Sequence, residues 1–140
     1  MQKGVMMEIL KTYFESVRGL GVLSTANARG EVNSAVYTKP YFMPDEMIAF
    51  VMRHKRTYAN LCENPHASFL FKEDGAGYQG KRLNLTKFDE SDDEQLIQTI
   101  LEQSTHVKSD RARLTEKLFV VVFQVNSILP LIGDGSAQAK

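Results

Sequence analysis

Apolar residues recur every three or four positions at the start of the chain and gather into six short runs later on. The first pattern predicts an amphipathic helix within 5–19, with Gly19 and Gly21 expected to end it. The later runs are short and rich in β-branched residues, which favours strands. The predicted strands are 20–26, 31–38, 47–52, 66–73, 77–88 and 117–125.

Turn and capping residues separate these runs. Asn27 and Gly30 tolerate the positive φ angle of a hairpin turn, so we expect the first two strands to pair directly. A short helix is predicted at Thr57–Glu63, before the next strand. Ser91, followed by Glu94 three residues later, forms a capping-box pattern and predicts the start of a third helix.

The order of these elements predicts a mainly β fold of the α+β type. Hairpins come early, and strands do not alternate with helices as they would in a parallel sheet. We therefore expect a six-stranded antiparallel sheet curled into a small barrel, with about three flanking helices. The chain of 140 residues fits one domain over 1–132, and its small, polar end at 133–140 is expected to form a flexible tail.

Charge and cysteine usage narrow the classes of partner. Seventeen basic residues balance seventeen acidic ones, so no whole-protein field is expected to attract nucleic acid or a membrane, and any anion site must be local. The single cysteine, Cys62, excludes an intrachain disulfide and suits a reducing compartment. Because the N-terminus has no long apolar stretch, we expect a cytoplasmic protein.

The most distinctive local feature is a cationic turn at 53–57, which reads RHKRT. It lies where the third predicted strand ends and the short helix begins. Such a turn is either a solvated surface feature or a site for an anion. The second interpretation has a physical basis, because a helix N-terminus presents unpaired N–H groups and a partial positive charge to a phosphate.

The segment MIAFVMRHKRTYANLCENPHASFLF, at 47–71, resembles the pyridoxamine-phosphate-oxidase-like, FMN-binding split-barrel family. The preceding hairpin, GVLSTANARGEVNSAVYT, is similar to the first two strands of that family. The resemblance covers approximately residues 10–125. It implies a split barrel and a homodimer with non-covalently bound FMN at the subunit interface. The implied activity is oxidoreduction or electron transfer with an unknown substrate.

The resemblance also implies which residues bind the cofactor. Arg56 and Thr57 match the pair that holds the flavin phosphate, with Lys55 or His54 as a further cation. Second- and third-strand residues match positions beside the ring and ribityl chain: Ala35, Val36, Tyr37, Phe50 and Val51. In the fifth strand, alternation places Arg82 on the polar face, where the family approaches the flavin of the partner subunit.

Two differences separate this chain from the true pyridoxamine phosphate oxidases. Their second strand carries an arginine near the flavin phosphate, whereas this chain has the uncharged NSAVYT. They also have an arginine–histidine substrate element near the C-terminus, whereas no arginine follows Arg113 here. The chain therefore looks like the short members of the family, and vitamin oxidation is not expected.

Two other functions remain open at the level of sequence. The same fold could hold haem or a deazaflavin, with His54, His66 or His106 as a haem ligand. Alternatively, the cationic turn could belong to a cofactor-free module that recognises an acidic segment of a partner. The spacing of Cys62 and the three histidines does not fit a structural metal site.

Overall fold

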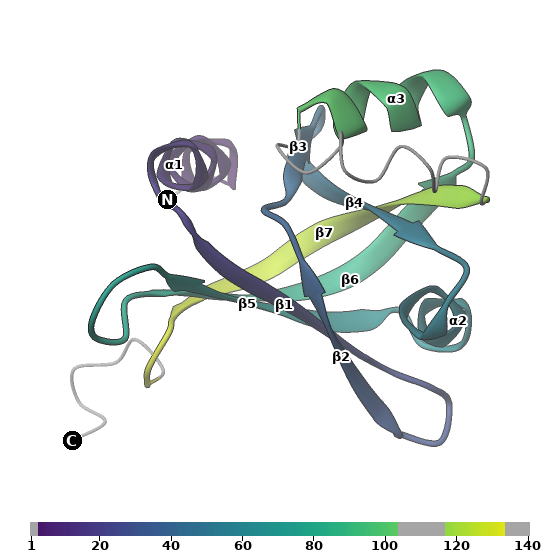
Figure 1. The fold of residues 1–140 in the computed structure, drawn as a ribbon, viewed down its shortest axis with the longest axis horizontal. Coiled ribbons are helices and arrows are strands. Elements are labelled where there is room, and N and C mark those ends of the chain that lie inside the picture. The colour runs from purple at the N-terminus through teal and green to yellow at the C-terminus, as the bar shows by residue number, and fades with distance from the viewer. Residues whose placement is uncertain (1–2, 104–116, 134–140) are drawn as a thin grey trace.

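A computed structural model describes residues 3–103 and 117–133 of the chain. Within these ranges, seven strands form one antiparallel sheet and three helices pack against it (Figure 1). In chain order the elements are α1 (Lys3–Ser16), β1 (Gly19–Ala26), β2 (Val32–Tyr37), β3 (Tyr41–Met43), β4 (Met47–Arg53), α2 (Arg56–Glu63), β5 (His66–Glu73), β6 (Gly80–Ser91), α3 (Glu94–Glu102) and β7 (Leu118–Pro130). The strand order is β2-β1-β5-β6-β7-β4-β3.

The mainly β, antiparallel class is confirmed, but the expected six-stranded barrel is not found, because the sheet has seven strands and does not close. The sheet is open, with β2 at one edge and β3 at the other. The additional strand, β3, has only three residues and pairs with β4 through Met43 and Met47. A three-residue strand beside Pro40 is too short to show an alternating pattern, so the sequence did not reveal it.

The last strand is longer than its apolar run. The prediction ended at Val125, whereas β7 continues to Pro130 and pairs with β6 along this extension. Asn126 lies at an irregularity in that pairing, between the Asn84–Ser127 and Leu85–Val125 pairs. The extension contains polar residues, so the apolar pattern does not predict it. Pairing with β6, rather than burial of every side chain, maintains its β conformation.

Two apolar clusters fill the space between the sheet and the helices. The larger contains fully buried rings such as Phe69 and Phe123, and α1 and α2 contribute to it. The smaller lies under α3, where Ile97 and Ile100 pack against Ala49 and Val120. The strands β4 and β7 lie between the two clusters. They therefore carry apolar side chains on both faces.

Both ends of α1 meet charged side chains from the segment that contains β3. The Lys39 ammonium donates to the carbonyls of Phe14 and Val17, at 2.7 and 2.8 Å. The Glu46 carboxylate lies beside Gly4 in the first turn. Each charge has the sign that the helix dipole favours at that end. The helix stops at Ser16, so the prediction that Gly19 and Gly21 end it is wrong: both belong to β1.

Two predicted local motifs also differ from the structure. Gly30 has a positive φ of 81°, but Asn27 does not have a positive φ; its Oδ1 accepts from the backbone N–H groups of Arg29 and Glu31. The expected capping box is absent from α3, because Ser91 still belongs to β6 and Asp93 is the N-cap. Short polar side chains suit both roles, so their chemistry alone does not select one.

Candidate functional site

The cationic turn lies where β4 passes into α2 (Figure 1). Lys55, the N-cap residue, has an extended backbone, and its side chain makes no capping hydrogen bond. The first intrahelical bond runs from the Ala59 N–H to the Lys55 carbonyl at 2.9 Å. The N–H groups of Arg56 and Thr57 therefore lie before the first intrahelical hydrogen bond, at the electropositive end of the helix.

The predicted cations surround this helix start. His54, Lys55 and Arg56 are all exposed to solvent. The ring of His54 also contacts two aromatic rings edge-on, Tyr58 with centroids 5.0 Å apart and Phe119 with centroids 6.0 Å apart. His54 is thus held by packing, while Lys55 and Arg56 extend into solvent. The structure therefore brings these three residues together, as the sequence predicted.

Thr57 differs from its neighbours because it is buried, with 5% of its surface exposed. Tyr37, the last residue of β2, lies close enough for Thr57 to affect its pKa. Burial raises the pKa of Tyr37, and Thr57 and the nearby Arg53 charge offset only part of that rise. The phenol is therefore protonated at neutral pH.

A second polar cluster beside the turn has no signal in the sequence. Tyr58 stacks on Phe119, with centroids 4.1 Å apart, and its hydroxyl donates to Glu90 at 2.5 Å. Glu90 also binds the Lys87 ammonium at 2.6 Å. The Glu90 hydrogen bond, followed by burial, raises the pKa of Tyr58. Burial tends to raise the pKa of Glu90, but the bonds from Lys87 and Tyr58 lower it overall.

The β1–β2 hairpin holds α2 in place. The buried Asn60 amide donates to the Thr25 hydroxyl at 3.1 Å, and the Glu63 carboxylate accepts from the Ala28 N–H at 2.9 Å. These bonds attach the middle and the end of the helix to β1 and to the turn that follows it. Cys62, in the same helix, is exposed.

The predicted strand residues do not share one surface. Val36 is 70% exposed on one face of β2, whereas the half-buried Ala35 and Tyr37 face the other way. Phe50 is only 3% exposed, and Val51 packs against the cluster under α3. The Phe50 side chain therefore belongs to the core, and cofactor contacts for these five residues stay a prediction.

Arg82 is far from the cationic turn within one chain. Arg53 pairs with Leu118 of β7, and Arg82 pairs with Leu129. These two β7 residues stand eleven positions apart, or about 35 Å along an extended strand. The Arg82 guanidinium donates to the carbonyls of Pro130 and Gly133. The two arginines therefore lie toward opposite ends of β7.

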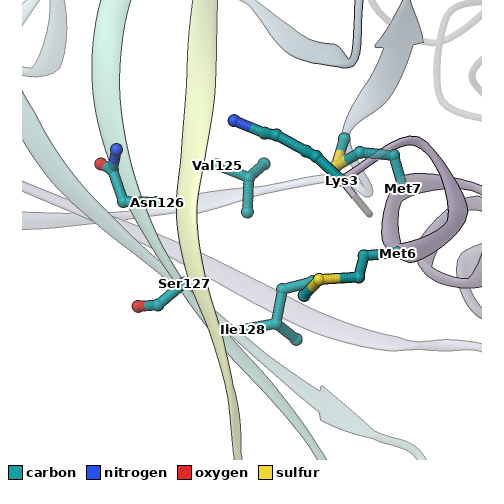
Figure 2. A pocket seen from close by; sticks show the side chains of 7 residues that line it. All are labelled: Lys3, Met6, Met7, Val125, Asn126, Ser127 and Ile128. Atoms are coloured by element: carbon teal, nitrogen blue, oxygen red, sulfur yellow. The ribbon is translucent and has the colours of Figure 1, made fainter. Parts of the chain in front are cut away.

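A groove of about 250 Å³ lies elsewhere, between α1 and β7. Figure 2 shows the side chains of Met6, Val125 and Ile128 facing the space between the helix and the strand, with Lys3 reaching across it. Asn126 points away on the other side of β7. None of the ten predicted cofactor-binding residues lines this groove, so it is separate from the candidate site.

Across residues 3–103 and 117–133, no three His, Cys, Asp or Glu side chains gather as a metal site. No helix in these ranges has the length and apolar character needed to cross a membrane. His106, one of the candidate haem ligands, lies outside the described residues, as does the predicted tail from 134 onward.

Comparison of the fold with solved structures gives close matches over most of the chain. An FMN-binding protein from Syntrophomonas wolfei subsp. wolfei matches with a TM-score of 0.68 and 22% identity, over 94% of this chain and 97% of that one. A candidate pyridoxamine 5'-phosphate oxidase from Listeria innocua matches with a TM-score of 0.63 and 17% identity, over 94% and 99%. The chain has the pyridoxamine-phosphate-oxidase-like split-barrel fold.

Members of this split-barrel fold differ in what they bind. An F420 reductase also matches, with a TM-score of 0.60 and 15% identity over 79% of this chain and 88% of that one. No protein-family model and no curated protein sequence matches the chain. At these identities the likeness establishes the split-barrel fold, and the choice of ligand has to be argued from the site itself.

Proposed function

We propose that this protein binds FMN, with the phosphate at the start of α2, and serves as an oxidoreductase or electron carrier. The observation that carries the proposal is the first turn of α2, where the N-cap side chain makes no capping bond and exposed Lys55 and Arg56 stand next to the buried residue Thr57. Structural likeness to an FMN-binding protein supports the same ligand. When bound, the flavin ring supplies the redox chemistry, because it exchanges one or two electrons or a hydride.

The residues at this turn fit a phosphate in both charge and hydrogen bonding. Arg56 offers a planar fork of donors, Lys55 a mobile ammonium and Thr57 a short hydroxyl. A phosphate dianion has only acceptor oxygens at neutral pH, which these donors match. Charge-assisted hydrogen bonds are each worth about 1.5–3 kcal/mol, so two or three are enough to anchor the ligand.

Binding of FMN and riboflavin tests this proposal, because riboflavin lacks only the phosphate. We expect the native protein to prefer FMN. We expect Arg56→Ala to weaken FMN binding by about 10- to 100-fold and to leave riboflavin binding unchanged. Arg29→Ala is the control: Arg29 is an exposed cation in the β1–β2 turn, where it pairs with Glu31 at 2.8 Å.

Several outcomes would contradict the proposal. Equal affinity for FMN and riboflavin would show that the phosphate does not bind at this turn. The visible spectrum of the purified protein, and the cofactor released on denaturation, distinguish FMN from a haem or a deazaflavin. A colourless protein that binds none of these would favour a cofactor-free binding module.

We also propose that the protein is a homodimer, formed through the uncovered face of the sheet. One cross-strand row on this face contains Val36, Val22 and Leu70, with Val36 70% exposed. None of the three belongs to either apolar cluster. The next row is small and polar, and its Ser24 and Ser34 hydroxyls are hydrogen-bonded at 2.7 Å. A partly apolar face of this kind suits a symmetric contact with a second copy.

Light scattering on size-fractionated protein tests the dimer. We expect the native protein to have twice the chain mass, and Val36→Lys to shift it to the monomer because a buried, unpaired ammonium is costly. Val5→Lys, at a position 50% exposed on α1, is the control and should stay dimeric. A monomeric native protein, or a dimer unaffected by Val36→Lys, would exclude this interface.

A further inference from the structure

The turn between β4 and α2 is tight, and His54 is at its centre. The N–H of Lys55 donates to the carbonyl of Arg53 at 2.8 Å, which closes a three-residue turn around His54. Lys55 is then the N-cap of α2, and the helix begins at Arg56. The backbone at His54 therefore sets the direction in which Lys55 and Arg56 leave the strand.

Aromatic packing holds this turn. The His54 ring lies edge-on to Tyr58, with centroids 5.0 Å apart and an interplanar angle of 84°. It also lies edge-on to Phe119, with centroids 6.0 Å apart and an angle of 83°. Aromatic rings favour this arrangement, because the edge of one ring is attracted to the face of the other. Tyr58 belongs to the first turn of α2 and Phe119 to β7, so His54 contacts the helix and the sheet at once.

The two rings that contact His54 are themselves fixed. Tyr58 and Phe119 stack with centroids 4.1 Å apart and an interplanar angle of 13°, and Tyr58 is only 8% exposed. The Tyr58 hydroxyl donates to Glu90 at 2.5 Å, and the Lys87 ammonium binds the same carboxylate at 2.6 Å. His54 therefore packs against a surface that is held from both the helix side and the sheet side.

This contact fixes the path by which the chain enters α2. A side chain just before the N-cap that packs on the first turns of a helix sets the angle of entry. His54 and Tyr58 stand in this relation on either side of the N-cap, Lys55, whose own side chain makes no capping bond. A phosphate at this helix start needs several donors to converge on it. Holding the turn in place before binding reduces the entropy cost of bringing them together.

We infer that His54 is a positioning residue for the phosphate: its ring, packed on Tyr58 and Phe119, holds the turn that directs Lys55 and Arg56, and its charge is not required. This inference rests on the proposed FMN site. It differs from direct contact between a His54 cation and the phosphate, and the two roles make opposite predictions for a ring without a charge.

Two substitutions at His54 separate packing from charge. His54→Phe keeps an aromatic ring that cannot become charged, whereas His54→Ala removes the ring as well. We expect His54→Phe to keep the native preference for FMN over riboflavin within about twofold, and His54→Ala to weaken FMN binding by about three- to tenfold without changing riboflavin binding. His54 is exposed, so both variants are expected to fold, which near-ultraviolet circular dichroism checks. His66→Ala, at an exposed histidine that begins β5, is the matched control.

The pH dependence of FMN binding is a second readout, which a loss of packing does not move. Histidine changes its charge between pH 5 and pH 8. We expect the ratio of native to His54→Phe affinity to be the same at about pH 6 and about pH 8. Protonation of the phosphate affects both proteins equally. The other ionisable groups around the three rings are also common to both proteins: Arg53, Lys55, Arg56, Tyr58, Glu90 and Lys117, whose ammonium lies 5.8 Å from the Phe119 ring centroid.

A double-mutant cycle checks that the ring contact causes the effect. Tyr58→Leu removes the nearer ring, so His54→Ala should weaken FMN binding by less than about twofold in this background. A loss of the same size in both backgrounds would show that the contact with Tyr58 is not the cause. The comparison of His54→Phe with His54→Ala stands without this variant.

The outcomes that overturn the inference differ from those that overturn the site. If the native protein prefers FMN and His54→Ala keeps that preference, or His54→Phe loses it, the role of His54 is wrong and the phosphate site stands. An advantage of about tenfold for the native protein over His54→Phe at acidic pH alone would make His54 a direct cationic ligand instead. If the native protein binds FMN no better than riboflavin, the phosphate site fails and the role of His54 fails with it.

Discussion

Gly21 has no room for a side chain, and replacing it by alanine should destabilise the whole domain. A Cβ at this position would lie 2.6 Å from Cζ of Phe69 and 2.7 Å from the Tyr37 carbonyl oxygen. Ordinary contacts between carbon atoms are about 3.5–4.0 Å, so the ring would have to move by about 1 Å. Gly21 is therefore required for close approach of the aromatic core to β1.

The surrounding core has little freedom to absorb this movement. Phe69 is fully buried, and its ring contacts Phe50 and Phe14 with centroids 5.0 and 6.3 Å apart. The Tyr37 carbonyl belongs to the backbone of the paired strand and cannot rotate away. Overpacking a core costs about 1–3 kcal/mol. Because the new methyl group would also meet a backbone carbonyl, we expect Gly21→Ala to cost about 3 kcal/mol, at the upper end of this range. For a domain of this size, that lowers the melting temperature by about 10 °C.

Urea denaturation followed by circular dichroism measures this cost in the absence of cofactor. Gly30 is the matched control, because it has a φ of 81° and a Cβ there would meet no atom within 4 Å. Gly30→Ala should cost about 1 kcal/mol through its left-handed backbone alone. Gly30→Asn should cost less, since asparagine tolerates that conformation, whereas Gly21→Asn should be at least as harmful as Gly21→Ala.

A second substitution tests whether the Phe69 ring is the cause. Phe69→Leu shortens the side chain that the new methyl group would meet. The cost of Gly21→Ala should then fall by at least about 1 kcal/mol in the Phe69→Leu background. The reasoning is refuted if Gly21→Ala lies within about 0.5 kcal/mol of the native protein, or if its cost is the same in both backgrounds.

Substitutions at three further positions test other parts of the structure by urea denaturation. Lys39→Met should destabilise the protein by about 1–2 kcal/mol, because two carbonyls at the end of α1 lose their donor, and Lys39→Arg should recover part of the loss. Thr25→Val should cost about 1–3 kcal/mol by leaving the buried Asn60 amide without its acceptor, whereas Thr25→Ser should be nearly neutral. Glu90 has a folded-state pKa below its ordinary value of 4.5, so its ionised form adds stability that is lost as the pH falls through the folded pKa. Stability of the native protein should therefore fall more steeply below about pH 5 than that of Glu90→Gln, and equal slopes would contradict this role.

Patterns confined to a few neighbouring residues predicted most of the elements. The period of the apolar residues located α1, and the short β-branched runs located six of the seven strands. The junction between β4 and α2 was predicted to within one residue, since a strand, a cationic turn and Pro65 follow one another directly. The grouping of His54, Lys55 and Arg56 at one helix start follows from that junction, because these residues are adjacent in the chain.

Long-range contacts could not be read from the same patterns. The bond between Asn60 and Thr25, and the bond between Tyr58 and Glu90, join residues 35 and 32 positions apart. Each depends on which elements become neighbours, and a polar or aromatic residue in a helix has the same local appearance with or without such a bond. The aromatic and acidic cluster at Glu90 was missed for this reason.

Some residues have a chemistry that suits two structural roles, and the local sequence does not choose between those roles. Gly19 and Gly21 fit a helix end by their backbone freedom, yet they lie in β1, and at Gly21 it is the Phe69 ring that leaves no room for a Cβ. Phe50 fits either a ligand contact or a core, and the rings around it place it in the core. Backbone preferences act between neighbours in the chain, whereas space and hydrogen-bond partners come from distant segments, so only the folded chain assigns the role.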